Sequence, residues 1–213
     1  MGLEVIPIVL VVGLAMFSPS GQVSANYAGS LKEGIGMEID YPNADEDGDY
    51  RCIYAFITTR YPKLDPQDAT QITTSLVESG KTHQIDPKFT AALIARESGF
   101  NKQAVSSAGA MGLGQIKPVN FPTLNIRNPF DVKENVSGTT QYVKTLMGYW
   151  KDQSAKVALT LASYFKGPTA VSNEMGRLDD KTQAYVKDIL GTYLKICASK
   201  SNSTPANPAL SVN

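Results

Sequence analysis

The sequence predicts a mainly α-helical domain of about six or seven helices with little or no sheet. From Asp49 onward, apolar residues recur with the helical period, and few runs alternate with the two-residue period of a strand. Asp65-Pro66 and Asp86-Pro87 each place a capping carboxylate before a proline that suits the first helical position. These pairs predict helices over residues 66–81 and 87–98.

Further helices are predicted on both sides of these two. One begins near Asp49, and Asp131 opens another that runs to about Trp150. Residues 155–165 form a strongly apolar helical pattern, and Asp180 caps a last helix that ends near Cys197.

Composition limits the possible functions. The 213 residues are 42% hydrophobic and 19% charged, which is typical of one globular domain with short extensions. Twenty basic residues balance twenty acidic ones, so the attraction that nucleic acid binding requires is missing and no nucleic acid partner is expected. With one histidine and two cysteines, no zinc cluster or other metal site is predicted. His83 is expected in a solvated loop, without a catalytic role.

The two ends of the chain are expected to lie outside the folded domain. An apolar run over residues 5–17 precedes a small-x-small pattern at 23–25, which predicts that residues 1–25 are a signal peptide and that the protein is exported to the periplasm or the cell exterior. Glu4 stands where a positive charge is usual, which leaves an uncleaved anchor as the alternative. Residues 26–48 are expected to be an acidic linker, residues 49–198 the domain, and residues 199–213 a flexible tail.

The two cysteines lie near opposite ends of the predicted domain. Because export permits disulfide formation, Cys52 and Cys197 are expected to pair, and such a bond would stabilise the fold by about 2–5 kcal/mol. Two buried thiols are the alternative.

Acidic residues crowd the segment 43–49. Oxygen-bearing side chains at alternate positions and a glycine at 48 resemble the first half of an EF-hand calcium loop. The second half fails, because Tyr54 stands where a bidentate glutamate should close the site. A solvated acidic linker that caps the following helix is the preferred interpretation.

Glu97 is the carboxylate that the pattern singles out. Phe89, Leu93 and Glu97 follow one another at i, i+4 steps, so the acid ends an apolar stripe, and Gly99 is expected to stop the helix just after it. An apolar environment and the negative end of the helix dipole both favour the protonated form. Such a carboxyl suits a general acid for glycoside cleavage, although a glutamate paired with Arg96 is the structural alternative.

The residues that follow resemble a known family. Glu97-Ser98, and then the block Ser107–Ile116 with Gly112-Leu-Gly-Gln115, resemble the soluble lytic transglycosylase domain of bacterial cell-wall enzymes, a lysozyme-like helical fold. The similarity covers about residues 75–196. Its other motifs are Asn128-Pro-Phe-Asp131 with Asn135 and Gly138, Leu161–Pro168, and Ala184-Tyr185-Val186.

The resemblance implies a peptidoglycan lytic transglycosylase that needs no cofactor. Glu97 would cleave the MurNAc-GlcNAc β-1,4 bond as acid and then base, leaving 1,6-anhydro-MurNAc. Tyr164 and Tyr185 would position or hydrogen-bond Glu97, and Ser98 would orient the acid or the acetamido group. Gln115 and Met111 would line the glycan site. The partners implied are glycan strands and envelope machinery, and a monomer is expected.

Several positions depart from the family pattern. Gly114 replaces a methionine, Phe165-Lys166 replace Asn-Ala, and Lys181-Thr-Gln183 replace a Glu-Thr-Arg sequence. A dinucleotide site is not predicted, because the order of the glycines is wrong and no strand precedes them. Two rival functions stay open: a muramidase, which would need a second acid such as Asp131, and a peptidoglycan-binding or envelope-assembly module with little catalysis.

Overall fold

The computed structural model describes residues 37–42, 44–174 and 177–198, and in this part of the chain the predicted fold class is confirmed. Seven α-helices and one short 3-10 helix account for the regular structure, with only isolated β-bridges beside them. The elements are α1 (Glu46–Arg60), α2 (Pro66–His83), α3 (Pro87–Glu97), η3 (Pro118–Asn120), α4 (Val132–Tyr149), α5 (Lys156–Lys166), α6 (Pro168–Asn173) and α7 (Asp180–Ala198).

The Asp-Pro pairs begin helices where they were predicted to. The Asp65 side chain accepts hydrogen bonds from the first-turn amides of α2, and the Asp86 side chain accepts one from the amide of Lys88 in α3. Helix α7 begins at Asp180, but the capping carboxylate is Asp179, which accepts from the Thr182 amide. The cap is therefore one residue earlier than predicted.

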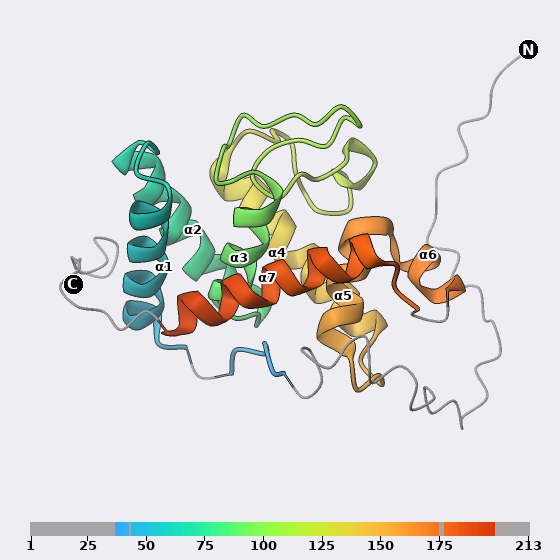
Figure 1. Ribbon diagram of the computed structural model, residues 1–213. Helices are drawn as coiled ribbons and strands as arrows, with labels where there is room; N and C mark the ends of the chain where they lie inside the picture. The colour runs from blue at the N-terminus through green and yellow to red at the C-terminus, as the bar shows by residue number, and fades with distance from the viewer. Residues whose placement is uncertain (1–36, 43, 175–176, 199–213) are drawn as a thin grey trace, which may run out of the picture.

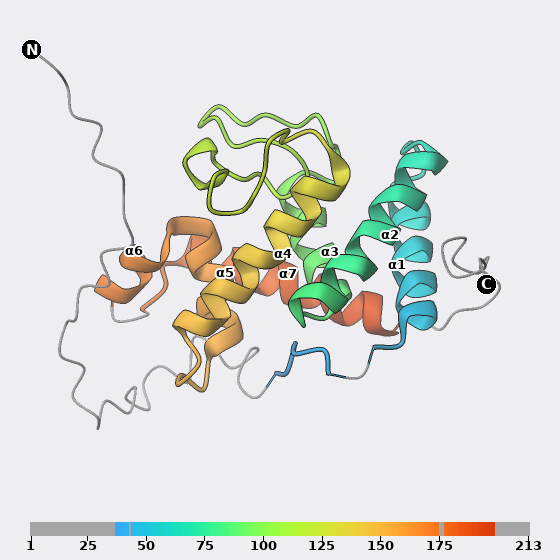
Figure 2. The same cartoon turned by 180° about the vertical axis from the view of Figure 1, so that it is seen from behind.

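Helix α3 is the centre of the molecule. Figure 1 shows α7 crossing in front of it, and the reverse view in Figure 2 shows α4 on its other side. Its residues from Phe89 to Ile94 are all buried, so α3 has no solvent-exposed face along most of its length. The middle of α3 is thus surrounded by its neighbouring helices.

Residues 37–42 pack onto this body, although the sequence predicted an acidic linker over 26–48. Ile39 is 0% exposed, and its carbonyl accepts a hydrogen bond of 2.8 Å from the Asp86 amide. Asp40 and Ile85 form an isolated antiparallel bridge. The packed body therefore includes this segment, which precedes the predicted domain start at Asp49.

Two acidic residues of the segment 45–49 have structural roles in the packed body. Asp45 caps the helix by accepting from the Gly48 amide, and buried Asp49 contacts Lys88 and Tyr41. Asn43, the first residue of the calcium-like pattern, lies outside the described residues. Within the described ranges, no group of three or more His, Cys, Asp or Glu side chains is placed to hold a metal ion.

The predicted disulfide is not present. Cys52 of α1 and Cys197 near the end of α7 are not joined by a disulfide bond. Burial raises the pKa of both thiols, with Lys88 opposing this for Cys52. A raised pKa favours the protonated thiol, which is the less reactive form.

The predicted signal peptide, residues 1–25, and the predicted tail, residues 199–213, lie outside the described residues. Among the helices that are described, none is long and apolar enough to cross a membrane.

Candidate active site

Glu97 is the last residue of α3 and is partly buried. The C-cap is Ser98, and the chain then turns sharply through Gly99 and Phe100, both of which have positive φ. The left-handed backbone of Phe100 is unfavourable, and complete burial of its side chain offsets this cost. Its ring packs edge-on against Tyr61 with centroids 5.0 Å apart. The turn fixes the end of α3, and with it the direction in which Glu97 leaves the helix.

Tyr185 of α7 holds the Glu97 carboxylate. Its hydroxyl donates a hydrogen bond to Oε1 of Glu97, and the tyrosine itself is only 4% exposed. Burial raises the pKa of Glu97, while the Tyr185 hydrogen bond and the Arg96 charge oppose this rise. Arg96 points its own charge at Asp188, 3.1 Å away, so the structural alternative of a Glu97–Arg96 ion pair is not what the structure contains.

Tyr164 lies near Glu97 but bonds elsewhere. Its hydroxyl donates to the carbonyl of Gly114 at 2.6 Å. Burial raises the pKa of Tyr164 well above its usual value, and the charge of Glu97 adds to the rise. Tyr164 therefore ties the glycine-rich loop, residues 107–116, to α5 beside the acid, while within the described part of the chain it is Tyr185 that donates to Glu97.

The glycine-rich loop packs directly onto α4. A Cβ at Gly112 would come within 2.3 Å of the Asn135 amide nitrogen, and a Cβ at Gly114 within 1.9 Å of the Thr139 hydroxyl. Buried Asn135 accepts from the Gly114 amide at 2.8 Å and donates to the carbonyl of Pro129 at 2.8 Å. The glycines at 112 and 114 are thus required by close packing. Because Thr139 occupies the space, position 114 has no room for the methionine of the family pattern.

The other predicted glycan-binding residues are engaged mainly with backbone. Gln115 has a positive φ, and its side-chain amide donates to the carbonyls of Gly112 and Ala104 at 2.9 and 3.1 Å. The Ser98 hydroxyl donates to the Ile94 carbonyl at 3.4 Å. Met111 is partly buried and exchanges two backbone hydrogen bonds with Ile116. The Gln115 and Ser98 contacts support the loop and the helix end.

Phe165 adds an aromatic ring to the site, a contribution that was not predicted from the sequence. It stacks on Tyr185 with ring centroids 4.6 Å apart and an interplanar angle of 24°. Arg96 lies over the Tyr185 ring and Lys181 over the Phe165 ring, each 5.6 Å from the centroid. The contact joins α5 to α7 directly beside the acid, across a sequence separation that no local pattern reveals.

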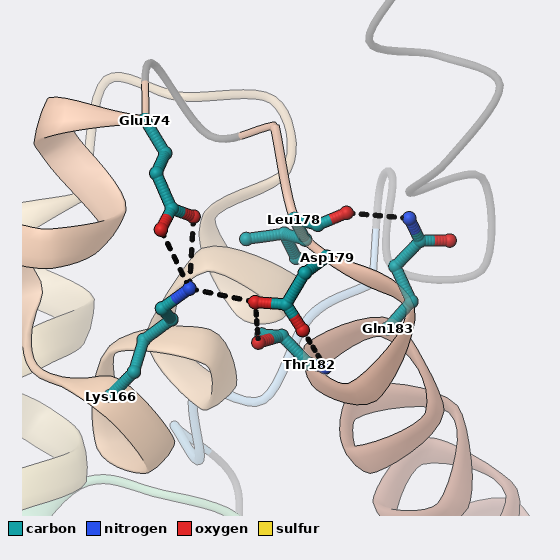
Figure 3. A network of polar contacts seen from close by, with 6 residues as sticks. All are labelled: Lys166, Glu174, Leu178, Asp179, Thr182 and Gln183. Carbon is teal, nitrogen blue, oxygen red and sulfur yellow. Dashed lines mark hydrogen bonds and ion pairs between the residues drawn. The ribbon is translucent and has the colours of Figure 1, made fainter.

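Lys166, the second departure from the family motif, joins three elements (Figure 3). Its ammonium contacts the Glu174 carboxylate at 2.7 Å and the Asp179 carboxylate at 2.8 Å. Asp179 also accepts from the amide and hydroxyl of Thr182, and the Lys166 hydrogen bond holds its pKa well below the usual range. Together these contacts fix the start of α7, the helix that carries Tyr185.

Two residues considered in the sequence have structural roles. Asp131, the possible second acid, accepts from the Glu134 amide at the start of α4. His83 lies in the last turn of α2, partly buried, with its Nε2 3.1 Å from the Ser137 hydroxyl, and burial lowers its pKa. The expectation of a solvated loop histidine is therefore wrong.

Comparisons with known proteins agree with this architecture. A curated transglycosylase of Enterobacteria phage PRD1 is 28% identical over 85 residues, which are 40% of this chain and 31% of the phage protein. The 70 kDa soluble lytic transglycosylase of Escherichia coli aligns at a TM-score of 0.50 with 21% identity, covering 66% of this chain and 25% of that one. Lytic transglycosylase Slt of Pseudomonas aeruginosa, solved as an inactive mutant, gives a TM-score of 0.52 with 19% identity over 68% and 26%.

These relatives are longer than the matched region, since the chain spans about a third or less of each. At such identities the two solved structures support the fold alone. The family model for the transglycosylase SLT domain, in contrast, matches residues 61–186, which is more than half of the chain. The match includes the Glu97 turn, the glycine-rich loop, Tyr164 and Tyr185. The chain therefore belongs to the transglycosylase SLT domain family.

Proposed function

We propose that this protein is a peptidoglycan lytic transglycosylase in which Glu97 is the catalytic acid and base. The observation that carries the proposal is the environment of this carboxyl group. It ends an apolar helix, burial raises its pKa, and its hydrogen-bond donor is a phenol. A raised pKa favours the protonated form, so a carboxyl group in this environment is suited to delivering a proton to a leaving oxygen.

The proposed reaction uses the Glu97 carboxyl group twice, first to donate a proton and then to accept a different one. Glu97 protonates the oxygen that links C1 of N-acetylmuramic acid to N-acetylglucosamine, and the C1–oxygen bond breaks. The acetamido oxygen stabilises the developing charge at C1. The Glu97 carboxylate then removes the proton of the muramyl C6 hydroxyl, and that oxygen bonds to C1 to form the 1,6-anhydro ring. Glu97 ends the cycle protonated, and no water is consumed.

A hydrolase of the usual kind would need a second carboxylate across the scissile bond. Asp131 is committed to capping α4, and Asp188 faces Arg96. Among the residues that the structure describes, the charge that lowers the pKa of Glu97 is that of Arg96, and no carboxylate acts on it. These contacts support the single-acid mechanism over the muramidase.

We assign supporting roles in this site to the other predicted residues. Tyr185 orients Glu97, and Tyr164 anchors the glycine-rich loop beside it. Because the amide nitrogen of Gln115 is occupied within the loop, we assign to Gln115 and Ser98 the shaping of the glycan site, with Met111 at its edge. The substrate places the protein in the cell envelope, reached by export, where it would act as a monomer on glycan strands alone or with envelope machinery.

The test is digestion of purified peptidoglycan followed by mass spectrometry of the released fragments. The wild type is expected to release anhydro-muropeptides, and Glu97→Gln to lose at least about 100-fold in rate, because general acid catalysis contributes that much or more. Glu78→Gln is the matched control, since Glu78 is an exposed glutamate on α2 paired with Lys133.

Other products would contradict the proposal. Fragments heavier by one water would identify a muramidase. Equal release by wild type and Glu97→Gln would exclude Glu97 as the acid. Binding to peptidoglycan without release would identify a binding or assembly module.

A further inference from the structure

The ring of Phe165 lies beside the candidate acid and stacks on Tyr185. It is 38% exposed, whereas the Tyr185 ring on which it stacks is almost fully buried. Phe165 therefore lies at the surface of the domain, with part of its ring in contact with solvent. It stacks on Tyr185, which among the described residues is the side chain that donates a hydrogen bond to Glu97.

Each ring of the stack also has a cation over it. Arg96 lies over the Tyr185 ring and Lys181 over the Phe165 ring. Cations over aromatic faces are attracted to the electron-rich ring, and the offset stacking of two rings adds a directional preference. The series Arg96, Tyr185, Phe165 and Lys181, here called the aromatic column, thus fixes the plane of the Tyr185 ring, and with it the direction of its hydroxyl.

We propose that Phe165 is a positioning residue that holds the Tyr185 phenol against Glu97 through the aromatic column. This rests on the proposed function of Glu97 and deepens it. In this position the family pattern has asparagine, which has no ring to stack, so the column is a feature of this chain. Phe165 acts through Tyr185 and needs no contact with the substrate.

The first test compares Phe165→Leu with Phe165→Tyr in peptidoglycan digestion. Leucine removes the ring, and kcat is expected to fall by about 3- to 10-fold, as expected for the loss of one stacked pair, with little change in KM. Phe165→Tyr keeps the stack and should retain wild-type kcat. Tyr149→Leu is the control, because Tyr149 is 55% exposed and packs edge-on against Trp150 on α4. An unchanged kcat in Phe165→Leu, or a rise in KM alone, would overturn the proposal.

The second test does not depend on turnover. The Glu97 carboxyl carbon is titrated by NMR in wild type, Phe165→Leu and Tyr185→Phe. Its pKa is affected by burial, by the Tyr185 hydroxyl that donates to it and by the Arg96 charge, and Tyr164 lies nearby. Loosening Tyr185 weakens a bond to the ionised form, so the Glu97 pKa is expected to rise in Phe165→Leu and to rise further in Tyr185→Phe.

The two tests separate the two ideas. A wild-type protein that releases no glycan fragments would refute the proposed function, while the titration would still decide whether Phe165 positions the pair. An identical Glu97 titration in wild type and Phe165→Leu would refute the positioning role, whatever the activity.

Discussion

The two ends of α3 carry acidic side chains in contrasting surroundings. At the start of the helix, Asp86 accepts from the Tyr193 hydroxyl at 2.8 Å and lies 3.0 Å from the Lys88 ammonium. At the other end, Glu97 accepts from the Tyr185 hydroxyl. Both tyrosines come from α7, so one helix supplies a phenol to each end of another.

The difference lies in the cation. Lys88 is partly buried between Asp86 and Asp49, and although burial disfavours its charge, the bonds to these carboxylates outweigh this and raise its pKa. Glu97 has no such ion pair, since Arg96 is directed at Asp188. A carboxylate that serves the fold is paired with an ammonium group, whereas the one proposed to serve chemistry is left with a neutral donor and can exchange its proton.

The largest expected effect comes from breaking the pair at the start of α3. Lys88→Met leaves buried Asp49 without its cation and is expected to lower the free energy of unfolding by about 3–5 kcal/mol, measured by urea denaturation. Lys133→Met, which removes an exposed ion pair with Glu78 on α2, should cost about 0–1 kcal/mol. Equal losses of stability in the two variants would show that Lys88 contributes no more to the fold than an exposed ion pair does.

Removing each tyrosine hydroxyl sharpens the comparison. Tyr193→Phe should lower the free energy of unfolding by about 1 kcal/mol and leave the pH dependence of activity unchanged. Tyr185→Phe removes a bond to ionised Glu97, so the pKa of Glu97 rises and the alkaline limb of kcat/KM moves to higher pH. A shift of the limb in Tyr193→Phe, or none in Tyr185→Phe, would contradict the assignment.

The pH dependence of stability should show that the ionised form of Glu97 is disfavoured in the folded protein. Because folding raises the pKa of Glu97 above 4.5, the folded state holds the proton more tightly, and the free energy of unfolding falls as the pH rises from 4.5 through the folded pKa. Glu97→Gln removes this cost, so its melting temperature should exceed that of wild type at pH 8 and the difference should shrink at pH 4. A variant less stable than wild type at pH 8 would argue against a disfavoured charge at position 97.

The smallest effect is expected at the exposed polar network of Figure 3. Lys166→Met frees the Asp179 and Glu174 carboxylates, and amides in the first turn of α7 should exchange hydrogen faster with little change in melting temperature. The effect should fade in high salt. Faster exchange confined to other helices would contradict the proposed fixing of α7.

Local signals predicted most of the fold. The aspartate caps at 65 and 86 and the stop after Glu97 are decided by neighbouring residues, so the helix ends could be read from short segments. The apolar period likewise placed Glu97 at the end of a buried stripe. The packing of Ile39 and the hydrogen bond of His83 depend on partners far away in the sequence. A periodic pattern of apolar residues does not predict such contacts.

The surroundings of the candidate site were harder to predict for the same reason. Resemblance indicated Tyr164 and Tyr185 as a pair around the acid, but the hydroxyl of Tyr164 bonds to the Gly114 carbonyl. Gln115 faces inward because its left-handed backbone turns its amide toward two carbonyls of its own loop. The stack of Phe165 on Tyr185 joins two helices and depends on how α5 and α7 pack.

Gly114 and Thr139 share one small volume, so changes at these two positions are not independent. The Thr139 side chain would lie 1.9 to 3.0 Å from any Cβ at position 114. Replacing Gly114 with the methionine of its relatives would therefore force the loop away from α4 unless Thr139 were reduced at the same time. In a double-mutant cycle, Gly114→Met and Thr139→Ala together should lower the free energy of unfolding by less than the sum of their separate effects. Thr139→Ala leaves empty space, and Gly114→Met needs that space.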